Sequence, residues 1–418
     1  MINNITEPSN NTKLLILGIY AFSLILFGFL VNTPLEILEG LQRIIASPDT
    51  LITDYIGIGN MGSALVNSGS LTLIVILIFY KLKPDINGFP IACLFTVAGF
   101  AFFGKNLFNV WLIILGVFLY AKNQKRDFKE VIYTALFGTA LAPVMTEILF
   151  STTSFLFTRI LLAIIVSVTI GFFLVPVSAN LLKVHEGFNL YNMGFTAGVV
   201  ITIVVSLLKS YGIVPEPRLI WTTGNNLLLG SYLFLLFTSM ILAGIYFERK
   251  PWDKLQCIWQ SSGQLVTDFV VLTGFGAVLI NMGINGFIVT LYILFIGGDL
   301  NGPTLGGVFT VVGFSALGKH PRNIIPIMGG VYLGTLNAEV NANDFSMQLA
   351  ALFGTTLAPI AGKYGGLWGI IAGLIHSSAI QNVGGLHRGL NLYNNGFVAG
   401  VIAAILIPII KTINERRR

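Results

Sequence analysis

The sequence predicts an all-α integral membrane protein with about fourteen (12–14) transmembrane segments, arranged as two inverted-topology repeats of about seven. Apolar segments recur along the 418 residues, four sequence blocks occur twice, and basic residues alternate between loops. Charged residues make up only 10% of the chain, against about 25% in an average soluble domain. So few charges cannot cover a soluble fold, which excludes soluble enzymes, nucleic-acid binders and secreted scaffolds.

The apolar segments predict the individual spans. The first run, 14–31, follows one lysine and lacks a small-residue cleavage site, so we interpret it as a retained span. Several later runs are shorter than the roughly 20 residues that cross a bilayer, which predicts re-entrant half-helices or segments that merge in pairs. The further runs lie at 59–80, 87–104, 107–121, 131–150, 160–182, 187–208, 228–247, 270–297, 302–318, 322–336, 347–362, 365–380 and 390–410.

Basic residues predict the orientation, because cytoplasmic loops collect Lys and Arg. With both termini inside, 18 of the 24 basic residues fall on the inner side, including those at 81–83, 122–129, 249–254 and 416–418. The outer segments hold the other six, which are Arg43, Lys105, Arg159, Lys209, Arg218 and Arg388. We therefore expect a multi-pass protein of the bacterial inner (plasma) membrane with both termini cytoplasmic.

Internal repetition divides the chain into an N-terminal repeat, 1–210, and a C-terminal repeat, 211–418. ALFGTALAP at 135–143 returns as ALFGTTLAP at 351–359, and NLYNMGFTAG at 189–198 returns as NLYNNGFVAG at 391–400. FTVAGFAFFGK at 95–105 and LITDY at 51–55 likewise return at 309–319 and 265–269. Ordered blocks that share polar residues indicate a tandem duplication. Because seven is odd, equivalent segments cross in opposite directions, an arrangement typical of solute transporters.

Amides at the start of the last span of each half are the strongest candidate site. An apolar span does not need them, and buried amides are costly unless paired. We expect them to offer donors and acceptors to a small polar solute, with capping of helix N-termini as the alternative. The candidate substrate-binding residues here are Asn189, Tyr191, Asn192, Asn391, Tyr393 and Asn394.

Two further repeated blocks carry candidate substrate-binding residues. Asn67 and Asn281 stand beside glycines inside apolar runs, which predicts either a helix break that lines a cavity or close helix packing. Thr139 and Thr355 precede Pro143 and Pro359. A proline inside a span predicts a kink, and these threonines either face the solute from a discontinuous helix or only mark that kink.

Ionisable residues supply the candidates for coupling to H⁺ or Na⁺. Asp54 and Asp268 occupy matching positions before a span, where helix capping is the favoured alternative. Glu147 aligns with Lys363, and His376 has no polar counterpart, so both are asymmetric coupling candidates. Lys105 and Lys319 end matching blocks, where we expect them to snorkel to the membrane surface.

The sequence predicts no cofactor, no metal site, no nucleic-acid partner and no enzymatic activity. Cys93 and Cys257 lie in unrelated apolar contexts, and no nucleotide-binding loop or metal-ligand cluster stands out. A membrane-embedded enzyme is the third alternative, and a homo-oligomer is left open. The expected partners are the lipid bilayer, a small hydrophilic solute and a coupling ion.

The duplicated NLYNxGFxAG and ALFGTxLAP blocks resemble those of a family of uncharacterised bacterial multispan membrane proteins, over nearly the whole chain. The chain also resembles urea transporters, which are inverted duplications, because VNSGS and GFNLYNMG stand where their span-opening and later blocks would be. It lacks their NNPxSG and LPxxTxPF patterns, and seven segments per half replace five. This second resemblance implies a urea-like solute.

These observations predict a transporter of a small hydrophilic solute, with its site near the midplane between the two repeats. A passive, channel-like facilitator is the alternative. The symmetric neutral residues favour the facilitator, whereas Glu147 and His376 favour a coupled carrier.

Overall fold

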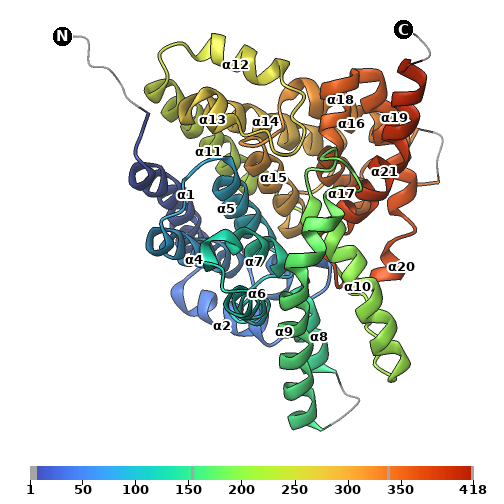
Figure 1. The fold of residues 1–418 in the computed structure, drawn as a ribbon. Helices are drawn as coiled ribbons and strands as arrows, with labels where there is room; N and C mark the ends of the chain where they lie inside the picture. Colours follow the sequence, from blue (N-terminus) through green and yellow to red (C-terminus); the bar gives the residue numbers. More distant parts are fainter. Residues whose placement is uncertain (1–6, 152–154, 337–338, 416–418) are drawn as a thin grey trace.

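The computed structural model describes residues 7–151, 155–336 and 339–415, and it is built almost entirely of helices (Figure 1). The predicted basic cluster at 416–418 lies outside the described residues. The helices of the first half are α1 (Asn10–Val31), α2 (Pro34–Ile45), α3 (Tyr55–Ile58), α4 (Met61–Leu82), α5 (Gly88–Phe100), α6 (Trp111–Asn123), α7 (Ile132–Gly138), α8 (Pro143–Phe150), α9 (Leu156–Leu181) and α10 (Asn192–Ser210).

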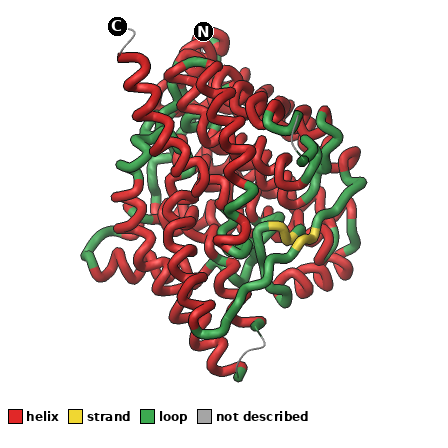
Figure 2. The backbone as a smooth tube through the Cα atoms, turned by 90° about the vertical axis from the view of Figure 1, so that its right-hand side faces the viewer, coloured by secondary structure: helices red, strands yellow, loops and turns green. Residues whose placement is uncertain are grey.

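The second half repeats this order. Its helices are α11 (Asn226–Phe247), α12 (Pro251–Gln260), α13 (Phe269–Thr273), α14 (Phe275–Phe295), α15 (Gly302–Phe314), α16 (Pro321–Leu333), α17 (Phe345–Gly354), α18 (Ala358–Tyr364), α19 (Gly366–Ile380), α20 (Gly384–His387) and α21 (Asn394–Glu415). Short 3-10 turns occupy Phe128–Glu130, Thr139–Leu141 and Thr355–Leu357. The strands β1 (Ile52–Thr53) and β2 (Leu219–Ile220) pair in parallel (Figure 2).

Eight helices in the described part of the chain are long and apolar enough to cross a membrane, or nine if the bent pair α7 and α8 counts as one span. The described residues therefore contain fewer helices of full spanning length than the twelve to fourteen segments expected from the apolar runs. The difference lies in short helices: α5, α6, α15 and α16 have 13 residues each. A helix of that length extends only about 20 Å, less than the thickness of the hydrocarbon core.

The short helices α5 and α15 lie at the centre of the molecule. Every residue of α15 is buried, as is nearly every residue of α5. A helix that is apolar on all sides belongs inside a protein or a bilayer. Each begins at an asparagine cap, Asn87 or Asn301, whose side-chain oxygen accepts a hydrogen bond from the first turn. The capped ends and apolar sequence explain why these segments form helices in the interior.

Equivalent helices of the two halves make equivalent contacts. Helix α1 packs on α4 as α11 packs on α14, and α6 packs on α9 as α16 packs on α19. Between the halves, α5 packs against its counterpart α15, and α10 packs against its counterpart α21. At the second of these crossings Gly194 faces Gly396, and each lies beside the tyrosine of the other half. Such reciprocal contacts are the pattern that a two-fold relation produces.

Backbone hydrogen bonds interleave the halves. The extended residues before α10 reach the turn between α17 and α18, where the amide of Leu190 donates to the carbonyl of Thr356 at 3.0 Å. The counterpart bond joins the amide of Leu392 to the carbonyl of Ala140 at 3.2 Å. The NLYN and ALFGT blocks of opposite halves therefore contact each other, so the halves share one interior.

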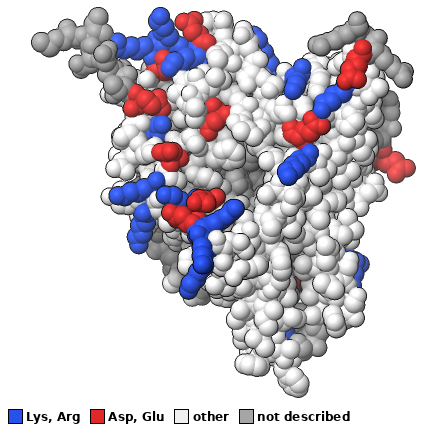
Figure 3. All heavy atoms as spheres, in the orientation of Figure 1, with Lys and Arg blue, Asp and Glu red and all other residues white. Residues whose placement is uncertain are grey.

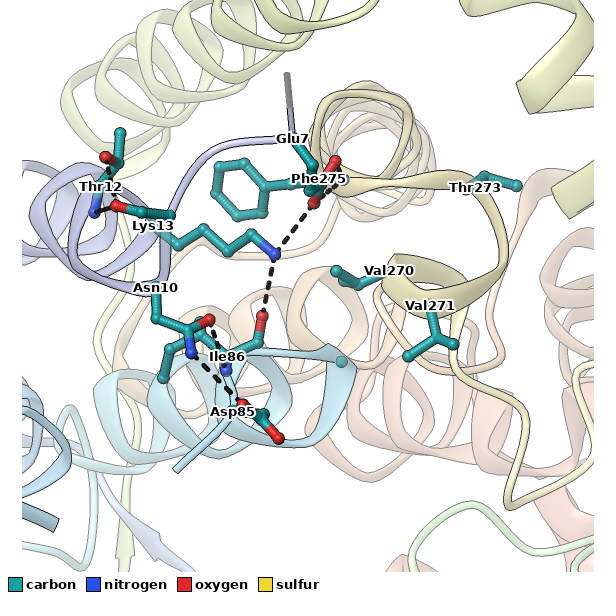
Figure 4. A network of polar contacts seen from close by, with 12 residues as sticks. Glu7, Asn10, Thr12, Lys13, Asp85, Ile86, Val270, Val271, Thr273 and Phe275 are labelled. Carbon is teal, nitrogen blue, oxygen red and sulfur yellow. Dashed lines mark hydrogen bonds and ion pairs between the residues drawn. The ribbon is translucent and has the colours of Figure 1, made fainter. Parts of the chain in front are cut away.

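A polar network ties the N-terminal segment to both halves (Figure 4). Lys13 forms an ion pair with Glu7 at 2.9 Å, and its ammonium also donates to the carbonyl of Ile86. The Glu7 carboxylate accepts from the amide of Phe275 at 3.0 Å, at the start of α14. Asn10 accepts from the amide of Ile86. The start of α1 is thus held against the loop before α5 and against the second half.

The surface is largely apolar, as a membrane protein requires. On the face shown in Figure 3, charged side chains gather in the upper and left parts, whereas the lower part over α9 and α10 carries very few. Large apolar side chains such as Phe157 and Leu161 on α9 are exposed. Contiguous exposed apolar surface of this kind indicates contact with lipid or with another protein.

Candidate functional site

The ends of α5 and α15 are held inside the molecule by two equivalent asparagines. Asn67 on α4 donates to the carbonyl oxygens of Ala101 at 2.7 Å and Lys105 at 2.9 Å. Asn67 stands six residues after the start of α4, which is about 9 Å along its axis. The turn that follows α5 therefore lies beside the second turn of α4, about 9 Å along that helix from its first residue and inside the protein.

Asn281 on α14 makes the matching bonds, to the carbonyl oxygens of Ser315 at 2.9 Å and Lys319 at 2.8 Å. The predicted break within the blocks of Asn67 and Asn281 is wrong, because α4 and α14 run through them without interruption. The alternative of close packing is confirmed: a Cβ at Gly69 would lie 2.6 Å from the carbonyl oxygen of Ala21 on α1. The break instead occurs after α5 and α15, and the asparagines satisfy its free carbonyls.

Lys105 and Lys319 follow these breaks and are both fully buried. The expectation that they snorkel to the surface is wrong, because the turns that carry them are anchored in the interior. The Lys319 ammonium donates to the hydroxyl of Tyr191 and, at 2.7 Å, to that of Thr355. The Lys105 ammonium lies over the ring of Phe100, 4.9 Å from its centroid, and lacks a hydrogen-bond partner among the described residues.

Tyr191 and Tyr393 meet where α10 crosses α21. Their ring centroids are 5.1 Å apart, and both side chains are buried. Both line a cavity of about 220 Å³. They mark its buried end, because Val266 and Glu130 on the same lining are exposed at the surface. Residues of both halves line this cavity, among them Glu130, Tyr133, Phe137, Asn192, Val266 and Phe314.

The remaining asparagines of the NLYN blocks divide into two roles. The side-chain oxygens of Asn189 and Asn391 accept from the amides of Tyr191 and Tyr393 at 3.1 and 3.0 Å, which fixes the turn before each span. Asn192 lines the cavity and bonds to the ring of His185 at 3.0 Å. The structure therefore brings Asn192 and both tyrosines to the cavity and gives Asn189 and Asn391 backbone partners.

A chain of polar contacts joins two other predicted residues in the second half. The ring of His376 is hydrogen bonded to Asn395 at 2.9 Å, and the amide of Asn395 donates to the side chain of Asn394 at 3.0 Å. All three are buried. His376 is thus connected to the NLYN block through Asn395. In the first half, His185 contacts Asn192 of that block directly.

Thr139 and Thr355 open the 3-10 turns that interrupt the span of each ALFGT block. In the first half the span bends by 41° at this turn, so the predicted discontinuity is present there. Thr139 donates to the carbonyl of Leu136, and Thr355 also accepts from Lys319. Only Thr355 therefore contacts a charged group near the tyrosine pair.

The two aspartates cap helices in both halves at once. Asp54 accepts from the amides of Ile56 and Gly302 at 2.9 and 3.1 Å, and from the amide and hydroxyl of Thr222. Asp268 accepts from the amides of Val270 and Gly88 at 2.9 and 2.8 Å. Each aspartate thereby caps the short central helix of the opposite half.

Glu147 lies away from the tyrosine pair. Its carboxylate accepts from the amide of Glu216 at 3.4 Å, in the segment that links the halves.

Asp49 is a buried carboxylate that the sequence analysis did not single out. It accepts from Tyr55 at 2.6 Å and from Asn109 at 2.9 Å, while burial raises its pKa to about 7. The hydrogen bonds of Asp49 and Glu147 therefore hold loops together near the segment that links the halves.

Comparison with known families gives one result. The model of a family described as "Protein of unknown function (DUF1576)" matches residues 33–210 and again residues 247–412. The chain belongs to this family. No curated protein and no solved structure matches the chain. The expected membership of a family without an assigned function is confirmed, whereas the resemblance to urea transporters stays a prediction.

The buried lysines are the main feature that sequence reasoning missed. A signal was present, because Lys105 and Lys319 end blocks that are repeated between the halves. A lysine that only anchors a span end does not need an equivalent partner in the second copy. Their depth could not be predicted, since it depends on Asn67 and Asn281 in another helix.

We expect substitution of the two lysines to affect stability differently. Lys319→Met leaves the hydroxyl of Tyr191 without its partner, and a lost buried hydrogen bond to a charged group costs about 1.5–3 kcal/mol. Lys105→Met removes a buried ammonium without a hydrogen-bond partner, which should leave stability unchanged or increase it. The apparent Tm of the purified protein in detergent measures both. Equal losses would contradict the assignment of Lys105 as unpartnered.

Proposed function

We propose that the protein is a polytopic membrane transporter of a small hydrophilic solute, with its site at the interface of two inverted repeats. The observation that carries this proposal is the cavity that opens at one end and stops at Tyr191 and Tyr393, where the halves meet. Transporters built from inverted repeats place substrate at such an interface, beside discontinuous helices. The proposed location is the bacterial inner membrane.

The arrangement of helices supports the inverted topology. In each half we assign five crossings and one re-entrant hairpin. The crossings of the first half are α1, α4, α7 with α8, α9 and α10, and its hairpin is formed by α5 and α6. The crossings of the second half are α11, α14, α17 with α18, α19 and α21, of which α19 is a short crossing of 15 residues, and its hairpin is formed by α15 and α16. This assignment places the basic clusters at 81–83 and 122–129 on one side, which the positive-inside rule identifies as the cytoplasm. Five is an odd number, so equivalent helices of the second half run in the opposite direction and both termini are cytoplasmic.

The cavity supports a carrier that exposes its site to one side at a time. Its open end lies beside Glu130 and Val266, which this topology places on the cytoplasmic side. Residue 52 is the counterpart of Val266 in the first half. On the outer side, residues 52 and 53 pair with β2 of the linker, and the amide of Thr222 donates to Asp54, so the linker covers the equivalent place. Rocking of one half against the other would open the outer side and close the inner one. A channel-like facilitator needs a continuous pore instead.

The test replaces the two asparagines that open α10 and α21. We expect Asn192→Ala with Asn394→Ala to abolish solute flux, because the variant removes hydrogen-bonding groups at and beside the cavity. The variant must also elute as a monodisperse peak in detergent, because the two asparagines bond to His185 and Asn395. Flux is measured in sealed proteoliposomes that contain a pH dye, while light scattering follows vesicle volume. The solutes are small amides, nucleobases, sugars, amino acids and carboxylates.

Asn180→Ala is the matched control, because Asn180 is exposed and donates only to the carbonyl of Pro176. Normal flux in the double variant would remove Asn192 and Asn394 from the site. Acidification together with volume change indicates proton coupling and directs attention to Asp54, Asp268, Glu147 and His376. Volume recovery alone favours a facilitator or another coupling ion. Silence across the panel would favour a membrane-embedded enzyme.

A further inference from the structure

The interior contains two ammonium groups without an acidic partner. In the part of the chain that the structure describes, the ion pairs involve Lys13, Lys129, Lys254 and Lys411, and none includes Lys105 or Lys319. Both side chains are fully buried. A buried charge is strongly destabilising unless an opposite charge or several hydrogen bonds compensate it. In their protonated form these two buried amines therefore carry charge that no carboxylate of the described residues neutralises.

The two lysines occupy equivalent positions in the repeat, but their hydrogen-bond partners differ. Lys319 donates to Tyr191 and Thr355, and the neighbouring Thr356 donates to the side chain of Asn189 at 2.6 Å. In the first half Ala140 stands where the second half has Thr356. The ammonium of Lys105 in the first half and the side-chain nitrogen of Asn391 in the second half are both buried, and both lack hydrogen-bond partners among the described residues. The side-chain nitrogen of Asn189, the counterpart of Asn391, donates to the carbonyl of Gly396 at 2.9 Å. Lys105 and Asn391 are therefore buried donors that are open to an acceptor from a solute.

The wall of the cavity connects this charge to the solute. Tyr191 lines the cavity, and its hydroxyl oxygen accepts a hydrogen bond from Lys319. An oxygen that accepts from an ammonium keeps its own proton free to donate. Glu130 is the one acidic side chain among the cavity-lining residues, and it stands on an exposed segment. The hydroxyl of Tyr393 donates to Thr96 at 3.4 Å, so Tyr191 is the tyrosine at the inner end that a lysine backs. A donor backed by a lysine favours anions.

Building on the transporter proposed above, we propose that its solute is a small anion, and that the ammonium groups of Lys105 and Lys319 meet its negative charge. Lys319 bonds to the hydroxyl of Tyr191. Lys105 lies over the ring of Phe100, whose centroid is 4.5 Å from that of Tyr393. In the present arrangement Lys319 bonds to Tyr191 of the first half and to Thr355 of its own half, whereas Lys105 lacks a hydrogen-bond partner among the described residues. The two-fold relation between the halves predicts the reverse arrangement in the opposite state, with Lys105 bonded to Tyr393 and Thr139 and Lys319 free.

The experiment compares charged and neutral solutes in the same vesicles. Proteoliposomes that contain the full chain are supplied with labelled succinate, phosphate, sulfate or nitrate, and in parallel with labelled urea or glycerol. We expect uptake of at least one anion, and uptake about tenfold or more slower in Lys105→Gln and in Lys319→Gln, because each variant loses a charge-assisted hydrogen bond to the solute. Lys363→Gln, which changes an exposed lysine, is the control and should transport normally.

A binding measurement keeps the result independent of flux. In detergent, the sodium salt of the transported anion should raise the apparent Tm of the unmodified protein more than sodium chloride does, and Lys105→Gln should lose this increase. Uptake of urea or glycerol without any anion would overturn the anionic substrate and leave the transporter standing. Absence of flux for every solute would overturn the proposed transport function. In that case an anion-dependent Tm increase would still support the anion site, and its absence would overturn that site as well.

Discussion

Gly194→Leu should prevent the two halves from assembling. A Cβ at residue 194 would lie 3.0 Å from the Cα of Gly396 and 3.0 Å from the Cβ of Tyr393. Gly396 meets Gly194 and Tyr191 in the same way. A leucine must therefore separate α10 from α21, at an expected cost above about 3 kcal/mol. The fraction of protein that elutes as a monodisperse peak after detergent extraction measures the loss, and we expect it to fall close to zero.

A graded series sharpens this prediction. Gly194→Ala adds one carbon at the same tight contact, so its yield and apparent Tm should lie between those of the unmodified protein and Gly194→Leu. Gly18→Leu is the matched control, because Gly18 lies within α1 and has open space where its side chain would be. If Gly194→Leu extracts as well as Gly18→Leu, the close crossing of α10 and α21 is wrong.

Asp54→Ala should lower stability by about 3 kcal/mol, since it leaves several buried donors without an acceptor. Those donors include the amide of Gly302 at the start of α15 and the hydroxyl of Thr222 in the linker. The variant removes one side chain that holds α3, α15 and the linker together. The apparent Tm in detergent and the rate of proteolysis of the linker measure the effect.

Two companion variants separate capping from general loss of charge. Glu39→Ala removes an exposed carboxylate and should leave the Tm unchanged. Asp54→Asn keeps one acceptor oxygen and should be intermediate. If Asp54 were mainly a coupling residue, Asp54→Asn would abolish flux with little change in Tm. That outcome would contradict the structural role that its hydrogen bonds indicate.

The sequence was most informative where a pattern repeats. The ALFGT and NLYN blocks identified the duplication, because ordered polar matches do not arise from apolar composition alone. The aspartates before α3 and α13 were correctly favoured as caps, since capping depends only on neighbouring residues. The expected break beside Asn67 and Asn281 is wrong, because the role of these asparagines depends on residues far away in the sequence. An asparagine beside a glycine does not reveal whether it interrupts its own helix or satisfies the broken end of another.

The sequence by itself therefore determined that the chain is an apolar, helical, duplicated protein, because composition, periodicity and repetition are properties of the chain. Only the tertiary structure decided the number of long helices and the place of the candidate site. Those depend on contacts between residues far apart in the sequence, such as Asn67 with Lys105 and Lys319 with Tyr191. A lysine near the end of an apolar run has the same sequence signal whether it reaches water or turns inward. The helix that holds its backbone determines which of the two occurs.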